Sequence, residues 1–331
     1  MRAAAALLAC LSLVSLSPRN LAFFEYQQPH MGTTVRIQIY AATAADAERV
    51  SSAAFERIRE LDDRFSDYSD SSELAGVSRA AGEDAVAVSA DLFRIVERAQ
   101  RIAATTEGAF DITIGPVSHL WRRARAAGQA PDAGRLEAAT RLVDYRRLHL
   151  SRAARTVRLT KRGMVLDLGG IAKGFAADAA IDTMIRLGGE RSVVAIGGDI
   201  VAADAPPGQP GWDVAIQAFG GGGQPPLRTL QLRRGALSTS GDAEQFLDVG
   251  ERHYSHIMNP RTGSAQTGRR SVTVRATDGA TADALATAIK ALGTERGLRL
   301  VNQFPEAQAL VTVEEGSSQR VFPSRRWRDG P

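Results

Sequence analysis

Six strand-like segments follow one another between residues 191 and 277, with no helical pattern between any two of them. They cover residues 191–203, 211–218, 227–233, 236–239, 253–258 and 270–277. Strands in direct succession pair as antiparallel hairpins, because a parallel pair needs a long crossover that is usually a helix. Helical patterns lie before and after this region. The order of elements therefore favours an α+β fold over the strict alternation of a doubly wound sheet.

Amphipathic helices are predicted in both parts of the chain that flank these strands. An alternating strand at 31–40 is followed by a helix that opens with Thr43 as an N-cap, and a second helix runs from Ser89 to about Thr106. Further helices are expected at 171–187, at about 280–292 and at about 294–303. We expect these helices to bury their apolar faces in the core.

Two stretches are not expected to form long elements. Residues 107–121 are interrupted by Gly108, Gly115 and Pro116, which indicates a structured loop. Residues 122–147 are rich in arginine and alanine and indicate a solvated excursion.

The N-terminus has the pattern of a secretory signal. Arg2 is followed by an apolar run from Ala3 to Leu16, which is shorter than the roughly 20 residues that a membrane-spanning helix needs. Residues 1–22 are therefore predicted to be a signal peptide or an N-terminal anchor. A lipoprotein is the less favoured alternative, because too little apolar sequence precedes Cys10.

Charge and cysteine content exclude several classes of protein. The formal net charge is only +4, and the high pI reflects arginine content more than a concentrated basic patch, so nucleic-acid binding is not implied. Cys10 is the sole cysteine, and its removal with a signal would exclude disulfides and zinc-thiolate sites. Only three lysines occur, and one of them, Lys173, lies inside a glycine-rich motif.

That motif reads DLGGIAKGFAADAA and spans residues 167–180. Residues 165–168 are strand-like and a helix is expected from Ile171, so Gly169 and Gly170 should form a tight turn with open backbone groups. A helix N-terminus and Lys173 together favour a phosphate or a metal-bound phosphate. The motif is neither a Walker loop nor a dinucleotide-binding G-x-G-x-x-G turn, and a simple turn is the alternative.

Two further groups of residues indicate chemistry. Asp283 and Thr287 lie four apart at the start of a predicted helix and share one face, where a carboxylate and a hydroxyl can hold a hard cation such as Mg²⁺. The alternative is that Thr281 or Asp283 only caps this helix. His256 ends a predicted strand before the turn N-P-R-T-G, and it can be a general base, a phosphate ligand or a structural residue.

Taken in order, these motifs resemble the ApbE family, the FAD:protein FMN transferases. The resemblance covers roughly residues 30–315 and is carried by MGTTV, RFSDYSDSSEL, GAFDITIGPVSHLW, DLGGIAKGFAADAA, VVAIGGDI, LSTSGD, YSHIMNPRTG and TADALATAIKALG. It implies an α+β fold with two related T-fold-like halves around a central flavin pocket. We expect one such domain over residues 23–318 and a C-terminal tail over 319–331.

The resemblance also implies an activity and a set of site residues. Members of the family use Mg²⁺ to cleave the pyrophosphate of FAD, transfer FMN to a threonine or serine hydroxyl of a partner flavoprotein, and release AMP. By position, the metal would be held by the carbonyl of Gly170 and by the side chains of Asp283 and Thr287. FAD would contact Met31, Tyr68, Ala109, Phe110, Asp111, Asp167, Lys173, His256 and Ile257.

Within this set, catalytic roles are expected for two residues. Lys173 would neutralise charge on the pyrophosphate together with the cation, and His256 would accept the proton of the hydroxyl or orient the phosphate. Tyr68 would lie against an aromatic ring of FAD. The chain departs from the family pattern at Asn259, where aspartate is usual, and at Ile112, where proline is common.

The resemblance finally implies a partner and a location. The acceptor would be a flavoprotein subunit of a membrane or periplasmic electron-transfer complex, and the protein itself would be periplasmic, with an inner-membrane anchor as the alternative. Two other functions stay open. One is an FAD pyrophosphatase that yields FMN and AMP, and the other is a non-catalytic FAD-binding accessory protein.

Overall fold

A computed structural model describes residues 21–217, 226–241, 246–249, 252–316 and 318–328. Residues 1–20, which make up nearly all of the predicted signal segment, lie outside this range. None of the described helices combines the length and the apolar composition that a membrane crossing needs.

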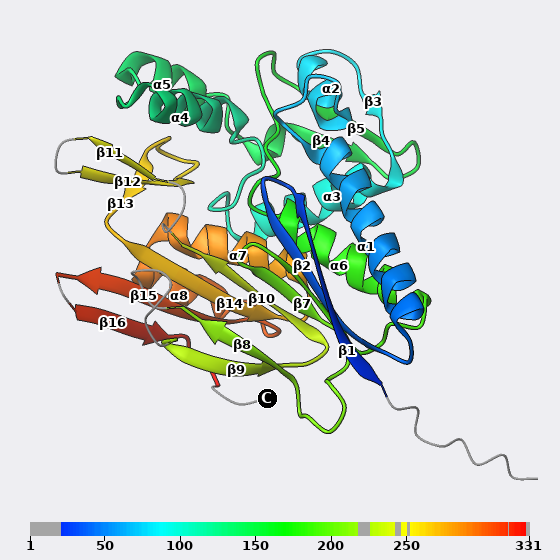
Figure 1. The fold of residues 1–331 in the computed structure, drawn as a ribbon. Helices are drawn as coiled ribbons and strands as arrows, with labels where there is room; N and C mark the ends of the chain where they lie inside the picture. Colours follow the sequence, from blue (N-terminus) through cyan, green and yellow to red (C-terminus); the bar gives the residue numbers. More distant parts are fainter. Residues whose placement is uncertain (1–20, 218–225, 242–245, 250–251, 317, 329–331) are drawn as a thin grey trace, which may run out of the picture.

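An eight-stranded sheet, antiparallel throughout, forms the centre of the molecule (Figure 1). In spatial order its strands are β1 (Ala22–His30), β2 (Thr33–Ala41), β6 (Ser192–Ile196), β7 (Asp199–Ala202), β10 (Gly235–Ser240), β14 (Arg270–Ala276), β15 (Gln308–Glu315) and β16 (Ser318–Pro323). The α+β class predicted from successive strands is confirmed, while the division into two related halves stays a prediction.

Helices cover one face of this sheet and a hairpin covers the other (Figure 1). The helices are α1 (Ala44–Phe65), α6 (Ala172–Arg186) and α7 (Gly279–Leu292), with α8 (Thr294–Val301) beside α7. The hairpin consists of β8 (Trp212–Ile216) and β9 (Arg228–Leu232), whose apolar residues pack with sheet residues in a second hydrophobic cluster. The predicted N-cap Thr43 is confirmed, because its side chain accepts the backbone N–H of Asp46. Ser89, where the second helix was predicted to begin, caps α3 in the same way through the N–H of Leu92.

Smaller elements lie along the upper edge of the molecule in Figure 1. One group comprises α2 (Glu73–Arg79), β3 (Val86–Ala87), α3 (Ala90–Thr105), the short 3₁₀ helix η1 (Tyr145–Arg147), β4 (Leu148–Ser151) and β5 (Thr156–Leu159). The other group comprises α4 (Gly115–Ala127), α5 (Ala133–Thr140), β11 (Phe246–Val249), β12 (Arg252–Met258) and β13 (Ala265–Thr267). Their cluster centres on Trp121, whose indole N–H donates to the Gly263 carbonyl at 2.8 Å.

This second group corrects the loop predicted for residues 107–121, because 115–121 are helical. Residues 122–147 are mostly exposed, as expected, but they are largely helical. Helix α4 starts at Gly115, because Pro116 suits a first helical turn and needs no hydrogen-bond acceptor there. Gly115 also packs against the backbone of Val165, where a Cβ on Gly115 would be 2.6 Å from the Val165 carbonyl oxygen. The arginine- and alanine-rich stretch forms the rest of α4 and α5, which pack on each other.

Three other local predictions are corrected. Residues 165–168 form no strand, since only an isolated bridge joins Val165 to Ile114. The single strand expected at 191–203 is the hairpin β6–β7, which turns at Gly197 with a positive φ of 58°. Residues 319–331 are not simply a tail, because 318–323 form the edge strand β16 and Trp327 is buried in the second cluster.

The N-terminal ends of α6 and α7 touch through their backbones, and this contact positions the residues that follow. A Cβ at Gly174 would lie 2.1 Å from the Gly279 carbonyl oxygen, so neither helix tolerates a side chain here. The Asp178 carboxylate on α6 accepts the N–H groups of Gly279 at 2.6 Å and Ala280 at 3.0 Å. The first turn of α7 is thus anchored by a side chain of α6.

This anchor should make stability depend on pH. Burial raises the pKa of Asp178 to about 7, and the backbone donors only partly oppose it. The folded protein therefore keeps a proton that the unfolded chain has released, so the free energy of unfolding should fall between pH 4 and pH 7, by an amount on the order of 3 kcal/mol. We expect Asp178→Asn to remove this part of the pH dependence in urea unfolding. The control is Asp182→Asn, which changes an exposed carboxylate on the same helix. If the free energy of unfolding fell with pH equally in wild type and in Asp178→Asn, Asp178 would not be the group responsible.

Candidate functional site

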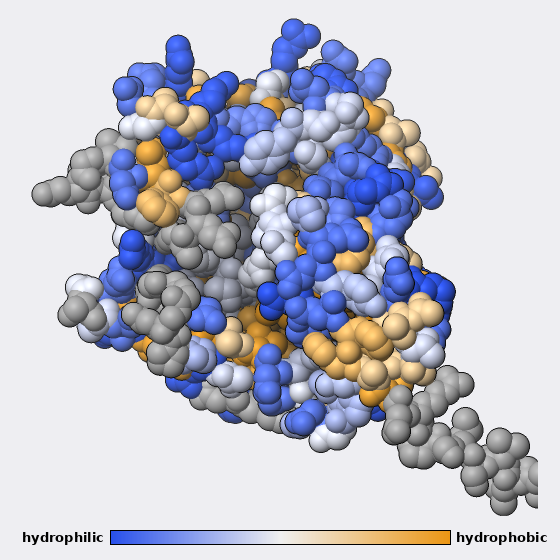
Figure 2. All heavy atoms as spheres, in the orientation of Figure 1, coloured by the Kyte–Doolittle hydropathy of each residue, from blue (hydrophilic) through white to orange (hydrophobic). Residues whose placement is uncertain are grey.

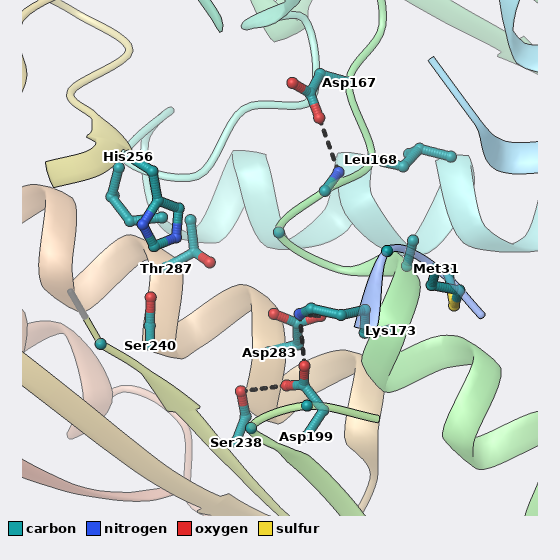
Figure 3. Close-up of a pocket in the computed structure, with 18 of the residues that line it drawn as sticks. Met31, Asp167, Leu168, Lys173, Asp199, Ser238, Ser240, His256, Asp283 and Thr287 are labelled. Carbon is teal, nitrogen blue, oxygen red and sulfur yellow. Dashed lines mark hydrogen bonds and ion pairs between the residues drawn. The ribbon is translucent and has the colours of Figure 1, made fainter. Parts of the chain in front are cut away.

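One cavity of ≈ 1500 Å³ is lined by segments from almost the whole length of the chain (Figure 3). All residues to which the sequence assigned a site role line it: Met31, Tyr68, Ala109, Phe110, Asp111, Asp167, Gly170, Lys173, His256, Ile257, Asp283 and Thr287. The fold thus brings together residues that are up to 256 positions apart in the sequence. Their individual roles stay predictions, and the geometry below limits them.

The glycine turn lies against helix α7. Asp167 Oδ1 accepts the N–H of Gly169 at 2.8 Å, which holds the turn before α6 begins. A Cβ at Gly170 would be 3.0 Å from Thr287 Oγ1, so the turn backbone and this hydroxyl are direct neighbours. The predicted turn is confirmed, and it is built to approach α7 closely.

Asp283 and Thr287 supply oxygen atoms to the same corner of the cavity. The alternative that Thr281 or Asp283 caps α7 is wrong, because Asp278 is the N-cap and its side chain accepts the Thr281 N–H. Asp283 is only 4% exposed and still lines the cavity. A carboxylate, a hydroxyl and a nearby backbone turn are hard oxygen donors, which fit Mg²⁺ with water and phosphate completing its shell.

A buried ion-pair cluster adjoins this corner, and sequence reasoning missed half of it. Lys173 Nζ lies 2.5 Å from Asp199 Oδ2 and 3.7 Å from Asp283 Oδ2. Ser238 donates its hydroxyl to Asp199 Oδ1 at 2.5 Å. Asp199 and Ser238 belong to the motifs VVAIGGDI and LSTSGD, and a charged residue opening an apolar strand was the signal that could have found Asp199. Figure 3 shows the cluster beneath Asp283.

The cluster changes how Lys173 and Asp283 are charged. Burial and the neighbouring Asp199 raise the pKa of Asp283 to about 7, while the Lys173 ammonium and the Gly174 N–H oppose that rise. Burial disfavours the ammonium of Lys173, but the two carboxylates outweigh it and raise the pKa of this lysine. The positive charge of Lys173 is therefore already paired with two carboxylates of the protein before any phosphate binds.

His256, on strand β12, lines the same cavity. In Figure 3 its imidazole and the hydroxyl of Thr287 both project into the cavity, with Ser240 nearby. Its neighbour Ile257 donates its backbone N–H to Ser255 Oγ at 3.1 Å, which holds the strand locally. A half-buried imidazole beside the oxygen donors can accept a proton or hold a phosphate oxygen.

Asp111, a predicted FAD contact, uses its carboxylate to hold neighbouring backbone segments together. Its Oδ1 accepts both the N–H and the hydroxyl of Thr113, and its Oδ2 accepts the N–H of Tyr145 at 2.9 Å. Burial raises the pKa of this carboxyl, and the donated hydrogen bonds oppose the rise. Its carboxylate shapes the wall formed by residues 109–111.

An arginine at the mouth of the cavity links three residues. The guanidinium of Arg122 lies 4.3 Å from the centre of the Tyr68 ring, and it forms ion pairs with Asp67 and Asp167, the latter at 3.1 Å. Burial would raise the pKa of Asp67, but His119 and Arg122 lower it below its ordinary value. Tyr68 is 78% exposed, so one face of its ring is available to a ligand. Sequence analysis missed Arg122, because it placed residues 122–147 in solvent.

The two residues that depart from the family pattern, Ile112 and Asn259, take part in hydrogen bonds that hold the backbone. Ile112 is 1% exposed, and its carbonyl accepts the Asp167 N–H at 2.8 Å. Asn259 Oδ1 accepts the N–H of Arg261 at 2.9 Å inside its own turn. Neither residue lines the cavity.

Comparisons with known proteins agree over nearly the whole chain. The sequence pattern of the ApbE family matches residues 31–311. The FAD:protein FMN transferase of Treponema pallidum (strain Nichols) is 32% identical over 321 residues, covering 92% of this chain and 86% of that one. The enzyme of the same name from Vibrio cholerae serotype O1 is 30% identical, over 89% of this chain and 90% of that one.

Solved structures are similar as well. The flavin transferase ApbE from Vibrio cholerae has a TM-score of 0.80 at 27% identity, covering 92% of this chain and 98% of that one. The ApbE protein from Thermotoga maritima has a TM-score of 0.81 at 28% identity, covering 92% and 97%. Every residue that lines the cavity falls within the matched range 31–311.

Proposed function

The chain belongs to the ApbE family, and on this premise we propose that its cavity carries out Mg²⁺-dependent transfer of FMN from FAD to a threonine or serine hydroxyl of an acceptor flavoprotein, with release of AMP. The enzyme is an FAD:protein FMN transferase, as are its relatives over most of the chain. The single observation that carries the proposal is the meeting of Gly170, Asp283 and Thr287 beside Lys173 in one cavity.

The metal would be held by the Asp283 carboxylate, the Thr287 hydroxyl and the carbonyl of Gly170. Mg²⁺ bound there would supply positive charge against the pyrophosphate oxygens. The Lys173 cluster favours such a cation, because two carboxylates face a single ammonium and leave an excess negative charge. Asp199, held by Ser238, keeps Lys173 beside Asp283, and the ammonium stabilises the ionised form of Asp283 that a cation requires.

The chain's own groups have distinct tasks in the transfer. The acceptor hydroxyl oxygen attacks the FMN-side phosphorus, the bond from that phosphorus to the bridging oxygen breaks, and AMP leaves with that oxygen. His256 accepts the hydroxyl proton, and the part of Lys173 that is exposed to the cavity faces the phosphate. Tyr68 offers its free face to an aromatic ring of FAD.

The function is tested with residues 20–331, FAD and a candidate threonine-bearing acceptor, with and without Mg²⁺. Mg²⁺-dependent AMP release together with an FMN-sized gain in acceptor mass is the expected result. Release of AMP and free FMN, with several candidate acceptors unmodified, would favour a pyrophosphatase. FAD binding without any AMP would identify an accessory protein.

A substitution of His256 separates proton transfer from binding. We expect His256→Gln to lower the transfer rate by about 10²-fold, the usual contribution of a positioned general base, and to leave the Kd for FAD within threefold. The rate of the variant should also lose the pH dependence that a titrating imidazole confers. His149→Gln, an exposed histidine on β4, is the control. A wild-type rate for His256→Gln would remove the general-base assignment.

We further propose that the protein works outside the cytoplasm on a flavoprotein subunit of a membrane or periplasmic electron-transfer complex. The basis is the signal-like sequence of residues 1–22 together with the family membership. Fractionation of cells that express the full chain tests the location.

A further inference from the structure

Arg125 brings a positive charge to the wall of the cavity. It lines the cavity from helix α4 and is half-buried there. In the part of the chain that the structure describes, its side chain makes no ion pair or hydrogen bond. Burial disfavours its charged form and Arg122 adds like-charge repulsion, so the pKa of Arg125 is lowered although the group stays ionised.

Arg122, about one helical turn before Arg125, differs from it in having charged partners within the protein. It pairs with Asp67 and Asp167 and stacks on Tyr68. Its positive charge is therefore compensated within the protein. Among the described residues nothing compensates Arg125 in this way, so Arg125 would gain more than Arg122 from an external anion.

The stretch of sequence that begins on α4 is rich in basic residues. Residues 122–162 contain twelve basic and three acidic residues, a net charge of +9 in a chain whose total is +4. The low total thus hides a stretch of sequence that is rich in arginine, although some of its arginines pair with acidic residues of other segments, as Arg152 does with Glu97. Figure 2 shows hydrophilic side chains along the upper edge of the molecule, where α4 and α5 lie in Figure 1.

We propose that Arg125 belongs to a docking surface for an acidic segment of the acceptor protein. The proposal rests on the proposed function, because a protein hydroxyl must then enter the cavity and its flanking residues must lie across the mouth. An acidic segment would neutralise the charge of Arg125. The acceptor is favoured over an FAD phosphate because the groups proposed to hold the metal and the pyrophosphate belong to the glycine turn, α6 and α7, whereas Arg125 belongs to α4.

Two fluorescein-labelled peptides test this surface. Each has a single central threonine, flanked by aspartates in one peptide and by asparagines in the other. Anisotropy with the FAD- and Mg²⁺-loaded protein gives both Kd values at low and at physiological salt. We expect the aspartate peptide to bind at least tenfold more tightly at low salt, with the difference shrinking as salt rises. Arg125→Gln should remove most of that difference and leave the Kd for FAD unchanged.

The control is Arg296→Gln, an exposed arginine on α8 that does not line the cavity, and it should keep the preference for the acidic peptide. Equal affinity for both peptides overturns the proposal, as does a preference that Arg125→Gln leaves intact. A weaker Kd for FAD in Arg125→Gln also overturns it, by assigning the residue to an FAD phosphate. Failure of the proposed function has a different signature, because wild-type protein would then release no AMP from FAD whatever the peptides do.

Discussion

Asp283→Ala is expected to lower Mg²⁺-dependent AMP release from FAD by about 10³-fold, comparable to the loss of a principal charge-stabilising group in an active site. Asp283 is the single carboxylate among the three proposed metal ligands, and it lies 3.7 Å from Lys173. Its loss removes the charge that attracts the cation and leaves Lys173 paired with Asp199 alone. The rate is measured by chromatography of AMP over a range of Mg²⁺ concentrations.

A second readout separates metal binding from folding. The wild-type melting temperature should rise when Mg²⁺ and FAD are added together, because a ligand that binds only the folded state stabilises it. Asp283→Ala should fold but show no Mg²⁺-dependent part of this rise. The control is Asp182→Ala, which removes an exposed carboxylate from α6. A wild-type rate for Asp283→Ala at limiting Mg²⁺ would remove the metal assignment.

Gly174→Ala is expected to destabilise the protein and to abolish its activity, although Gly174 is not one of the residues proposed to bind FAD or the metal. The new Cβ would lie 2.1 Å from the Gly279 carbonyl oxygen, so α6 and α7 must separate. Since α6 carries Lys173 and α7 carries Asp283 and Thr287, the site would come apart with the helices. We expect a loss of about 3 kcal/mol in the free energy of unfolding, at the upper end for an overpacked contact.

Gly76→Ala is the matched control, because Gly76 also lies within a helix. A Cβ there would meet only the flexible end of Arg79 at 3.7 Å. This change should be neutral or stabilising by about 0.5 kcal/mol, since alanine has the higher helix propensity. Urea unfolding and AMP release are measured for both variants. Equal effects of the two substitutions would show that the α6–α7 contact has no special role.

Local signals in the sequence determined much of the secondary structure and the site motifs. Thr43 caps α1 as predicted, because an N-cap depends on neighbouring residues alone. The succession of strands indicated antiparallel pairing, which the sheet has, although β10 pairs with β7 and β14 and not with the strands next to it in the sequence. The pair Gly169 and Gly170 indicated a turn before α6. The shared face of Asp283 and Thr287 follows from helical spacing, which holds wherever the helix is placed.

Other features depended on which segments meet in space. Sequence analysis placed 122–147 in solvent, yet Trp121 and its neighbours pack on β12 and bring Arg122 to the mouth of the cavity. The start of α4 lies so close to the backbone of Val165 that Gly115 has no room for a Cβ, and no local pattern records that contact.

The charge state of the site was also decided by tertiary contacts. Lys173 was expected to neutralise charge on the pyrophosphate, and the fold adds that it lies beside Asp199 and Asp283, from two other elements. Local sequence determines backbone conformation through neighbours a few residues apart. The strength of a charge depends instead on burial and on partners brought from distant segments, and those exist only once the chain has folded.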